Sequence, residues 1–258
     1  MTSESNTRAN RYGSLAAEVY DLDKPVDSLF DGAFHRARLA EIAGPILEPA
    51  CGSGRALIPL LEAGHEVIGF DSSAEMLANC RARCAERGLT PHLSQQRFED
   101  FTYDRRFGAV FVPAGSFGLV ADYSMALEVL RRFYDALEPG GLLIVDVEPV
   151  SALRATASSR RSWTAANGDL LVYEARPMGV DWIAQVRRHH GVYERWREGA
   201  LVETELEPMA LRYWTIQEMR LTLRDIGFDN VAIFGNYNRR RGPVSRDDVL
   251  TFEATRAA

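Results

Sequence analysis

Two short stretches carry the residue types and the spacing of a nucleotide-binding site. Residues 46–55 are a short apolar run followed by a turn of small residues, and residues 66–71 are an apolar run that ends in a carboxylate. Asp71 follows Gly52 by nineteen residues, close to the offset of about 20 residues at which an acid binds ribose hydroxyls in dinucleotide-binding folds. The pattern therefore predicts a site for a ligand that contains ribose.

The charge and the glycine pattern of the first stretch argue against a pyrophosphate in this site. A dinucleotide site has the pattern G-x-G-x-x-G and no negative charge facing the phosphates. Here Leu57 occupies the third glycine position counted from Gly52, and Arg55 occupies it counted from Ala50. Glu48, near the end of the predicted strand, repels phosphate and suits an ammonium group. S-adenosylmethionine, which has a ribose, an amino-acid ammonium group and no phosphate, fits these residues better.

Five segments together resemble the motifs of class I S-adenosylmethionine-dependent methyltransferases. They are the glycine-rich segment 48–55, the ribose-binding segment 69–77, the adenine-side segment 96–101, the segment 112–117 beside methionine and substrate, and the turn 137–141. The resemblance covers about residues 30–150, and it is specific because the five motifs occur in the family's order and spacing. It implies in-line methyl transfer from S-adenosyl-L-methionine to a small-molecule acceptor, with N- or O-methylation favoured.

The resemblance also implies which residues contact the cofactor. In chain order they are Tyr12, Tyr20, Glu48, Ala50, Gly52, Gly54, Arg55, Asp71, Ser72, Met76, Phe98, Glu99, Pro113, Ala114 and Ser116. Two positions depart from the family pattern. Ala50 replaces the usual first glycine, and Arg97 stands where many relatives have an aspartate on the adenine amine. Only a backbone contact with adenine is therefore expected at Phe98, with a weaker one at Glu99.

No acid–base pair stands out, and the catalytic residues are left unassigned with three candidates. Tyr20 lies on a predicted helix that closes over the cofactor in similar enzymes, and an aromatic face suits the cationic sulfonium. Glu148 follows a predicted strand, where it could hold an amine or accept its proton. His189 and His190 lie on a predicted strand, so only one of them can face the site. Because the sulfonium is already activated, alignment of the reactants supplies most of the catalysis.

The elements expected to position these residues alternate between strands and helices. Strands are predicted at 46–50, 66–70, 92–97, 107–112 and 142–147, with helices at 54–63, 73–87 and 122–137 between them. Period-two segments at 170–175, 182–188, 192–197 and 201–211 predict antiparallel hairpins with turns at 177–179 and 198–199. A helix from Thr215 to Ile226 and strands at 231–234 and 249–253 complete the chain.

These elements predict an α/β fold with a doubly wound, Rossmann-like, seven-stranded, mostly parallel sheet. An antiparallel β-hairpin insertion and an N-terminal helical lid are expected to be added to it. We divide the chain into an arm and lid helix (1–27), a cofactor-binding core (28–150), an insertion that caps the substrate (151–214) and a C-terminal helix with the last two strands (215–258).

The composition narrows the partners. A net charge of −6 disfavours nucleic acid. The three cysteines lack the paired spacing of a zinc site, so no metal is expected. The sequence shows no signal core and no apolar run long enough to span a bilayer, which favours a cytoplasmic monomer or homodimer without a membrane partner. Two other functions stay open: a cofactor-binding scaffold or sensor without turnover, and an NAD-dependent oxidoreductase.

Overall fold

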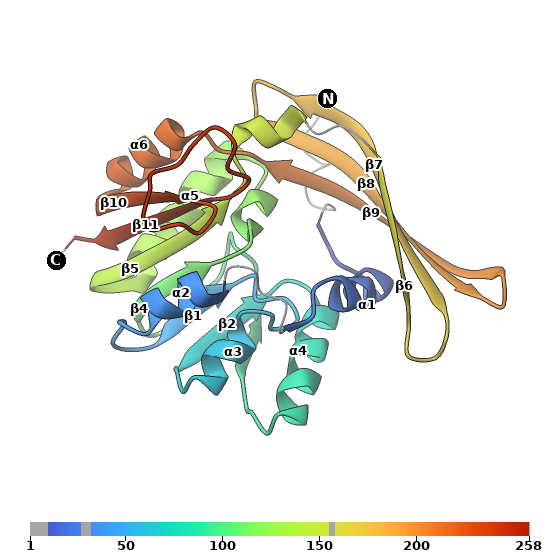
Figure 1. The fold of residues 1–258 in the computed structure, drawn as a ribbon. Helices are drawn as coiled ribbons and strands as arrows, with labels where there is room; N and C mark the ends of the chain where they lie inside the picture. Colours follow the sequence, from blue (N-terminus) through green and yellow to red (C-terminus); the bar gives the residue numbers. More distant parts are fainter. Residues whose placement is uncertain (1–9, 27–31, 155–157, 258) are drawn as a thin grey trace.

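The computed structural model describes residues 10–26, 32–154 and 158–257, which form two separate sheets (Figure 1). The larger sheet has seven strands in the order β10-β11-β5-β4-β1-β2-β3. Its strands are β1 (Ile46–Pro49), β2 (Val67–Asp71), β3 (His92–Gln95), β4 (Phe107–Val112), β5 (Leu137–Val147), β10 (Phe228–Gly235) and β11 (Leu250–Arg256). Strand β11 pairs antiparallel with β5 and β10, and the other pairs are parallel, so the predicted mostly parallel sheet is confirmed.

Helices cover both faces of the larger sheet, as its strand pattern requires. The described helices are α1 (Ser14–Asp23), α2 (Gly32–Leu39), α3 (Leu57–Glu62), α4 (Ala74–Glu86), α5 (Tyr123–Ala136) and α6 (Ile216–Ile226), with short 3-10 helices η3 (Ser116–Leu119) and η4 (Val150–Arg154). Alternate strand residues face opposite layers. Thus Leu47 and Val110 pack in the cluster that contains α5 and α6, whereas Ile46 and Ala109 pack in the cluster that contains α3 and α4.

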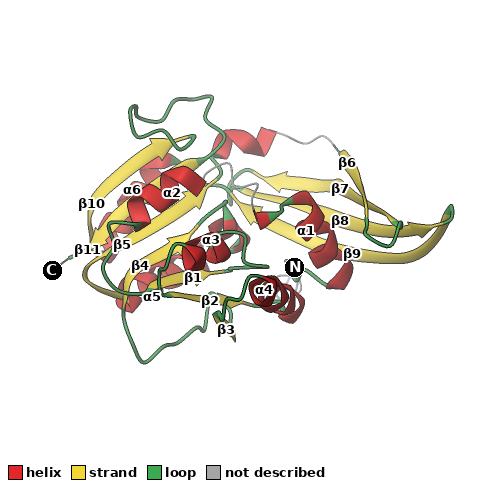
Figure 2. Ribbon diagram, turned by 60° about the horizontal axis from the view of Figure 1, so that its bottom comes forward, coloured by secondary structure: helices red, strands yellow, loops and turns green. Residues whose placement is uncertain are grey.

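The smaller sheet is the predicted antiparallel insertion. It consists of β6 (Ser159–Thr164), β7 (Leu170–Asp181), β8 (Val186–Arg197) and β9 (Ala200–Arg212), in that order across the sheet. Figure 2 shows this sheet standing beside the larger one, with α1 lying against it. The insertion leaves and re-enters the core at one place, because Trp214 donates its backbone N–H to the carbonyl of Glu148 at 3.3 Å and forms a β-bridge with Pro149.

The predicted helix 54–63 begins later in the structure, at Leu57. Gly52 and Gly54 adopt left-handed backbone angles, with φ of 54° and 87°, which prolong the loop before the helix. Residues 138–141 do not form the predicted turn before the strand. They lie inside β5 as a bulge, and β5 pairs with β4 on both sides of it.

Other differences lie in the insertion and at the first helix. The predicted turn at 177–179 is a bulge within β7, and the chain turns instead at residues 182–185. Strand β6 was not predicted. The sequence indicates Ser14 as the cap of a short first helix, but the N-cap of α1 is Gly13, which makes no side-chain cap. The sequence also indicates Asp27 or Ser28 as the cap of the next helix, and these two positions lie outside the described residues.

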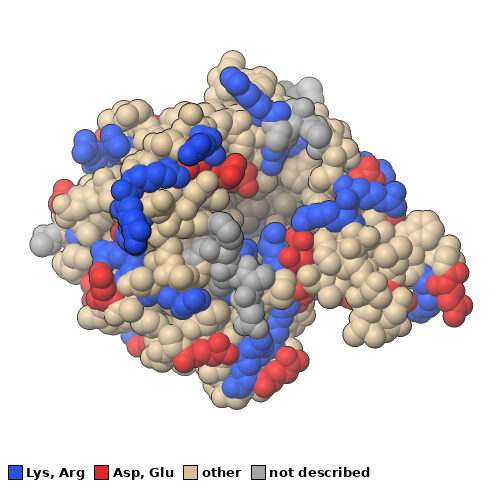
Figure 3. All heavy atoms as spheres, in the orientation of Figure 1, with Lys and Arg blue, Asp and Glu red and all other residues tan. Residues whose placement is uncertain are grey.

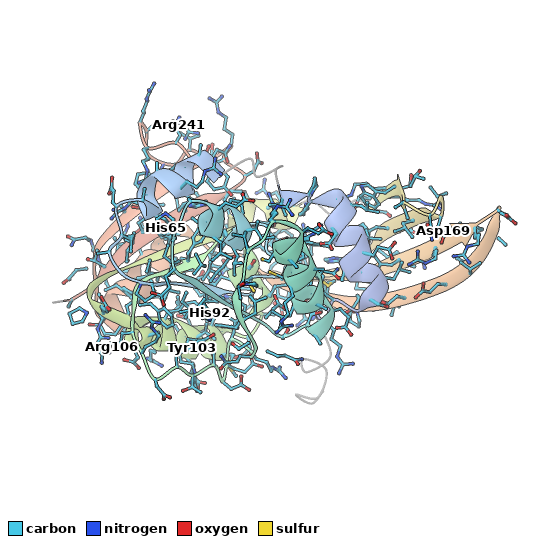
Figure 4. All side chains as sticks on the ribbon, turned by 90° about the horizontal axis from the view of Figure 1, so that it is seen from below. His65, His92, Tyr103, Arg106, Asp169 and Arg241 are labelled. Atoms are coloured by element: carbon cyan, nitrogen blue, oxygen red, sulfur yellow. The ribbon has the colours of Figure 1, made fainter. Side chains whose placement is uncertain are left out.

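Two histidines lie at the edge of the larger sheet that is opposite the expected ligand site. His65 precedes β2 and His92 begins β3, so both lie at the amino edge of the sheet, away from the carboxyl edge where ligands bind in such folds (Figure 4). Within the described residues, no helix combines the length and the apolar character needed to cross a bilayer. The division into four chain segments stays a prediction.

Candidate functional site

The loop after β1 is shaped by three residues with left-handed backbone angles. Ala50, Gly52 and Gly54 have φ of 52°, 54° and 87°. The conformation at Ala50 strains an ordinary residue, which explains why a glycine is the usual occupant. A Cβ at Gly54 would lie 2.7 Å from Cys80 Sγ, whereas a Cβ at Gly52 would meet no atom within 4 Å. Gly54 therefore serves close packing against α4, and the loop is open on the side of Gly52.

Asp71 at the end of β2 joins this loop to the next one. One carboxylate oxygen accepts the backbone N–H of Gly52 at 2.9 Å, and the other accepts that of Ser73 at 2.9 Å. Burial raises the pKa of Asp71, and these amide bonds oppose that shift. The backbone N–H of Ser72 also acts on this carboxylate. Because a carboxylate accepts about four hydrogen bonds, Asp71 keeps capacity for a further donor such as a ribose hydroxyl.

The N-terminal helix brings two predicted tyrosines to the same place. The rings of Tyr12 and Tyr20 meet edge to face, with centroids 6.1 Å apart. Burial raises the pKa of Tyr12, as do the nearby Tyr20 and, more weakly, Asp71. Arg55 forms a hydrogen bond with Tyr20, and Glu48 lies close enough to raise its pKa. The structure thus groups these five predicted residues around the loop after β1.

The adenine-side residues are more scattered. Met76 is buried on α4, and Ser72 is exposed. Phe98 packs edge to face against Phe70, with ring centroids 6.1 Å apart, and also against Phe133. Phe70 directly precedes Asp71 on β2. Phe98 thus serves the core, and its adenine contact stays a prediction.

Glu99 forms an ion pair with Arg97, the residue that departs from the family pattern. The side chains of both residues are partly exposed to solvent. The guanidinium of Arg97 balances the charge of Glu99 in this pair. The adenine contact of Glu99 also stays a prediction.

The segment after β4 is held by a buried carboxylate from the neighbouring strand. Asp146 on β5 is fully buried, and its Oδ2 accepts the N–H of Ala114 at 3.0 Å and contacts His35 Nε2 at 3.0 Å. Tyr237 donates to the same oxygen at 3.4 Å, and Thr251 donates to Oδ1 at 2.6 Å. Ala114 has φ of 57°. Asp146 therefore fixes the strained turn that contains the predicted residues Pro113, Ala114 and Ser116.

Glu148 faces this turn from the end of β5. A Cβ on Gly115 would lie 3.8 Å from Glu148 Cγ. Glu148 also lies beside the hydroxyl of Tyr213, whose pKa is raised by burial and by the negative charge of Glu148. The guanidinium of Arg187 stacks on the Tyr213 ring at 4.9 Å. The carboxylate therefore stands between the turn after β4 and a cationic, aromatic part of the smaller sheet.

His189 shares a face of the smaller sheet with Arg187. On β8 it stands opposite Met209 of β9, two residues from Glu207, which contacts the chain before α1. Burial, followed by the charge of Arg187, lowers the pKa of His189 to about 4. His189 Nδ1 is buried without a hydrogen-bond partner. Of the two predicted histidines, His189 is the one on the face toward α1, and it is neutral near pH 7.

These parts surround a recess between the two sheets, which the space-filling view shows as a hollow (Figure 3). Two cavities lie elsewhere. One of about 420 Å³ is lined by Tyr123, Arg188 and Glu218, among others, on the outer face of the smaller sheet, and one of about 500 Å³ lies near Tyr103 and Arg132. The described residues contain no cluster of three or more side chains suited to hold a metal ion.

The residues fit S-adenosylmethionine on the chemistry of their donors and acceptors. The loop is open at Gly52, Asp71 has acceptor capacity for a ribose diol, and aromatic rings of Tyr12 and Tyr20 stand ready for a cation. Glu48, only 2% exposed at the end of β1, adds negative charge that suits an ammonium group and excludes phosphate.

The sequence analysis missed several residues that organise the site. Asp146, which holds the turn at Ala114, and Ser73, which bonds to Asp71 and Tyr12, are among them. Arg187, Glu205 and Glu207 were not singled out. The acids at every second position of segment 201–211 were a usable signal, because they must lie on one face of a strand.

Comparison with known proteins finds a family model and relatives that match part of the chain. A family model described as a methyltransferase domain matches residues 46–141. The dTDP-3-amino-3,6-dideoxy-alpha-D-glucopyranose N,N-dimethyltransferase of Streptomyces fradiae is 33% identical over 144 residues, which are 52% of this chain and 54% of that protein. The chain spans only 38 to 42% of the length of the first three curated relatives.

Two solved structures match almost the whole chain. An S-adenosylmethionine-dependent methyltransferase from Clostridium acetobutylicum has a TM-score of 0.76 at 17% identity and covers 94% of this chain and 98% of its own. The CcbJ methyltransferase from Streptomyces caelestis has a TM-score of 0.75 at 25% identity, covering 96% and 98%. The predicted class I fold is confirmed.

Proposed function

We propose that this chain, whose residues 46–141 form a methyltransferase domain within a class I fold, transfers a methyl group from S-adenosylmethionine to the nitrogen of a small amine. The observation that carries the choice of an amine is the place of Glu148. Its carboxylate lies between the turn after β4 and Tyr213, on the side of the site where the acceptor is expected. A carboxylate there attracts an ammonium group, which loses its proton to solvent, and then accepts an N–H of the neutral amine. The lone pair of this amine forms the bond to the methyl carbon as the bond from that carbon to sulfur breaks.

Each group of residues has a part in this proposal. Asp71 and the open loop at Gly52 bind the ribose, and Glu48 binds the ammonium group of the cofactor. Bound S-adenosylmethionine supplies an electrophilic methyl group on a positively charged sulfur. Asp146 holds the turn at Ala114 that faces the acceptor, and Glu148 orients the amine, so that alignment lowers the barrier.

His189 contributes hydrogen bonding and not proton removal from an ammonium ion. A pKa of about 4 makes it too weak a base for that task, while its neutral ring can accept a hydrogen bond from a hydroxyl or amine of the acceptor. The Streptomyces fradiae relative is named for N,N-dimethylation of an amino sugar, which agrees with an amine acceptor.

A labelled methyl-transfer assay on paired acceptors tests this proposal. Each small amine is compared with the alcohol of the same carbon skeleton, and the wild type is expected to label the amines alone. Glu148→Gln should lower kcat/KM for amines at least tenfold, because a neutral amide attracts an ammonium group less, while the cofactor affinity measured by calorimetry stays within twofold.

Other outcomes distinguish the alternatives. Labelling of the alcohols alone would make this an O-methyltransferase. Tight cofactor binding with no transfer to any acceptor would favour the scaffold or sensor. Glu138→Gln, an exposed acid at the other end of β5, is a matched control that should leave transfer unchanged.

A further inference from the structure

We infer that Glu205 and Glu207 of β9 are positioning residues for the cofactor, because they fasten the chain around the start of α1 above Asp71. The inference rests on the proposed cofactor site. The two glutamates lie two residues apart on one strand, so their side chains share the face of the smaller sheet that is turned toward α1.

Glu207 binds the chain just before the helix. Its Oε1 accepts the N–H of Gly13 at 2.9 Å, and its Oε2 accepts the N–H of Arg11 at 3.3 Å. Glu207 is only 5% exposed, and burial raises its pKa. Burial disfavours the ionised form of Glu207, and the two backbone N–H groups offset this by donating hydrogen bonds to the carboxylate.

Glu205 binds the first turn of the helix itself. Its Oε2 accepts the N–H of Leu15 at 3.1 Å, and its Oε1 accepts the N–H of Ala16 at 3.2 Å. No side chain of α1 caps this end, so Glu205 supplies both the missing acceptors and a negative charge at the positive end of the helix dipole. A Cβ at Gly13 would lie 2.7 Å from Glu205 Oε1, so a side chain at this position would displace the Glu205 carboxylate.

The fastened segment leads directly to the ribose-binding residue. The carbonyl of Tyr12 accepts a hydrogen bond from Ser73 Oγ at 2.9 Å, and the N–H of Ser73 donates to Asp71. Tyr12 has φ of 50°, a left-handed angle that neighbouring contacts must maintain. Its ring meets Tyr20 on α1. A continuous series of hydrogen bonds therefore runs from the two glutamates through Tyr12 to Asp71.

Asn10 ties the same segment to the acceptor side. Its backbone N–H donates to Pro208 at 2.9 Å, and its side chain donates to the carbonyls of Ala210 at 3.0 Å and Leu119 at 3.2 Å. Leu119 ends the 3-10 helix that follows the turn after β4. Residues 10–16 thus contact the smaller sheet, the 3-10 helix that follows the turn after β4, and Ser73 in the loop after β2.

The double variant Glu205→Gln/Glu207→Gln tests the inference in the full chain. A glutamine has one acceptor oxygen, and its NH₂ group opposes the second backbone amide, so each side chain loses one bond. If only a tenth of the molecules then keep the segment fastened, the apparent Kd for S-adenosylmethionine rises tenfold. We expect at least that rise by calorimetry, with kcat at saturating cofactor within threefold of wild type.

Two controls separate positioning from folding. Glu194→Gln lies on the opposite face of β8, where its carboxylate accepts from Trp196, and should leave the Kd unchanged. The melting temperature of the double variant should stay close to that of wild type, because the segment before α1 opens locally while the two sheets stay folded.

A second measurement needs no cofactor. Hydrogen exchange at the amides of Arg11, Gly13, Leu15 and Ala16 should be at least tenfold faster in the double variant, with the strands of the larger sheet unaffected. Unchanged exchange at these amides would overturn the inference, as would faster exchange with an unchanged Kd. If the wild type bound no S-adenosylmethionine, the proposed function would fail, and the exchange experiment would still decide whether the two glutamates fasten the segment.

Discussion

At the scale of single residues, Asp71 shows how one carboxylate serves two neighbouring loops. It accepts amides from Gly52 and Ser73, and it retains acceptor capacity toward the proposed ribose. The sequence was sufficient to find this residue, because its offset from Gly52 and its place after an apolar strand are local signals. Asp146 was not recognised as a hub, because its partners His35, Ala114 and Thr251 lie 111, 32 and 105 residues away in the chain.

The role of Asp71 leads to a prediction about affinity and pH. Asp71→Asn should weaken S-adenosylmethionine binding by about ten- to a hundredfold, the range expected for losing one hydrogen bond to a charged group. Burial raises the pKa of Asp71 above its ordinary value of 3.8. The ionised form accepts the ribose hydroxyls, so wild-type affinity should fall as the pH is lowered, starting at a higher pH than for an ordinary aspartate.

Calorimetry over a pH series measures this effect. The control is Asp135→Asn, an exposed aspartate near the end of α5, which should leave both the affinity and its pH profile unchanged. Equal affinities of wild type and Asp71→Asn would remove Asp71 from the ribose site.

At the scale of elements, the predictions succeeded where local signals agreed with the tertiary fold. Helix α6 begins at the Thr215 capping box with Glu218 and ends at Gly227 in the left-handed conformation, close to where the sequence placed it. Segment 177–179 carries proline and glycine, which the sequence indicated as a turn, but the structure uses them for a bulge inside β7. The strand continues through this segment because residues on both sides of the bulge pair with β8. Such pairing cannot be predicted from the local sequence.

The segment after β4 gives a prediction at this scale. Asp146→Asn puts an amide NH₂ group among donors, so at least one buried donor such as the N–H of Ala114 loses its acceptor. The free energy of unfolding should fall by about 2 to 4 kcal/mol, and kcat should fall because the strained turn is released.

Urea denaturation and steady-state kinetics measure the two effects. Thr251→Val, which removes one donor and leaves the carboxylate to the others, should cost about 1 kcal/mol and change kcat less. A loss of stability without any change in kcat would limit Asp146 to a structural role.

At the scale of the whole molecule, the two sheets together form the proposed site. The larger sheet supplies the proposed cofactor loops, the smaller sheet supplies the proposed acceptor wall, and α1 with the residues before it contacts both. The sheets themselves were predicted from the sequence, but this joining was not, because backbone amides bound by Glu205 and Glu207 leave no trace in residue types at the N-terminus.

Binding of the cofactor across this junction should stabilise the whole fold. At a concentration of 100 times Kd, S-adenosylmethionine should add about 2.7 kcal/mol to the free energy of unfolding, which corresponds to a rise of about 5 to 10 °C in melting temperature for a domain of this size. NADH at equal concentration should cause no rise. A thermal shift with NADH instead of S-adenosylmethionine would restore the oxidoreductase as the better function.

The single crossing point of the insertion has a consequence for divergence among such enzymes. Its two ends meet at Glu148, Pro149 and Trp214, so the strands between them can be lengthened, shortened or exchanged without shifting any strand of the larger sheet. New acceptor preferences can therefore arise by replacement or gradual mutation of this insertion, while the cofactor-binding residues stay unchanged. Glu205 and Glu207, which fasten α1, belong to the insertion. A functional replacement of the insertion must therefore include them or equivalent residues.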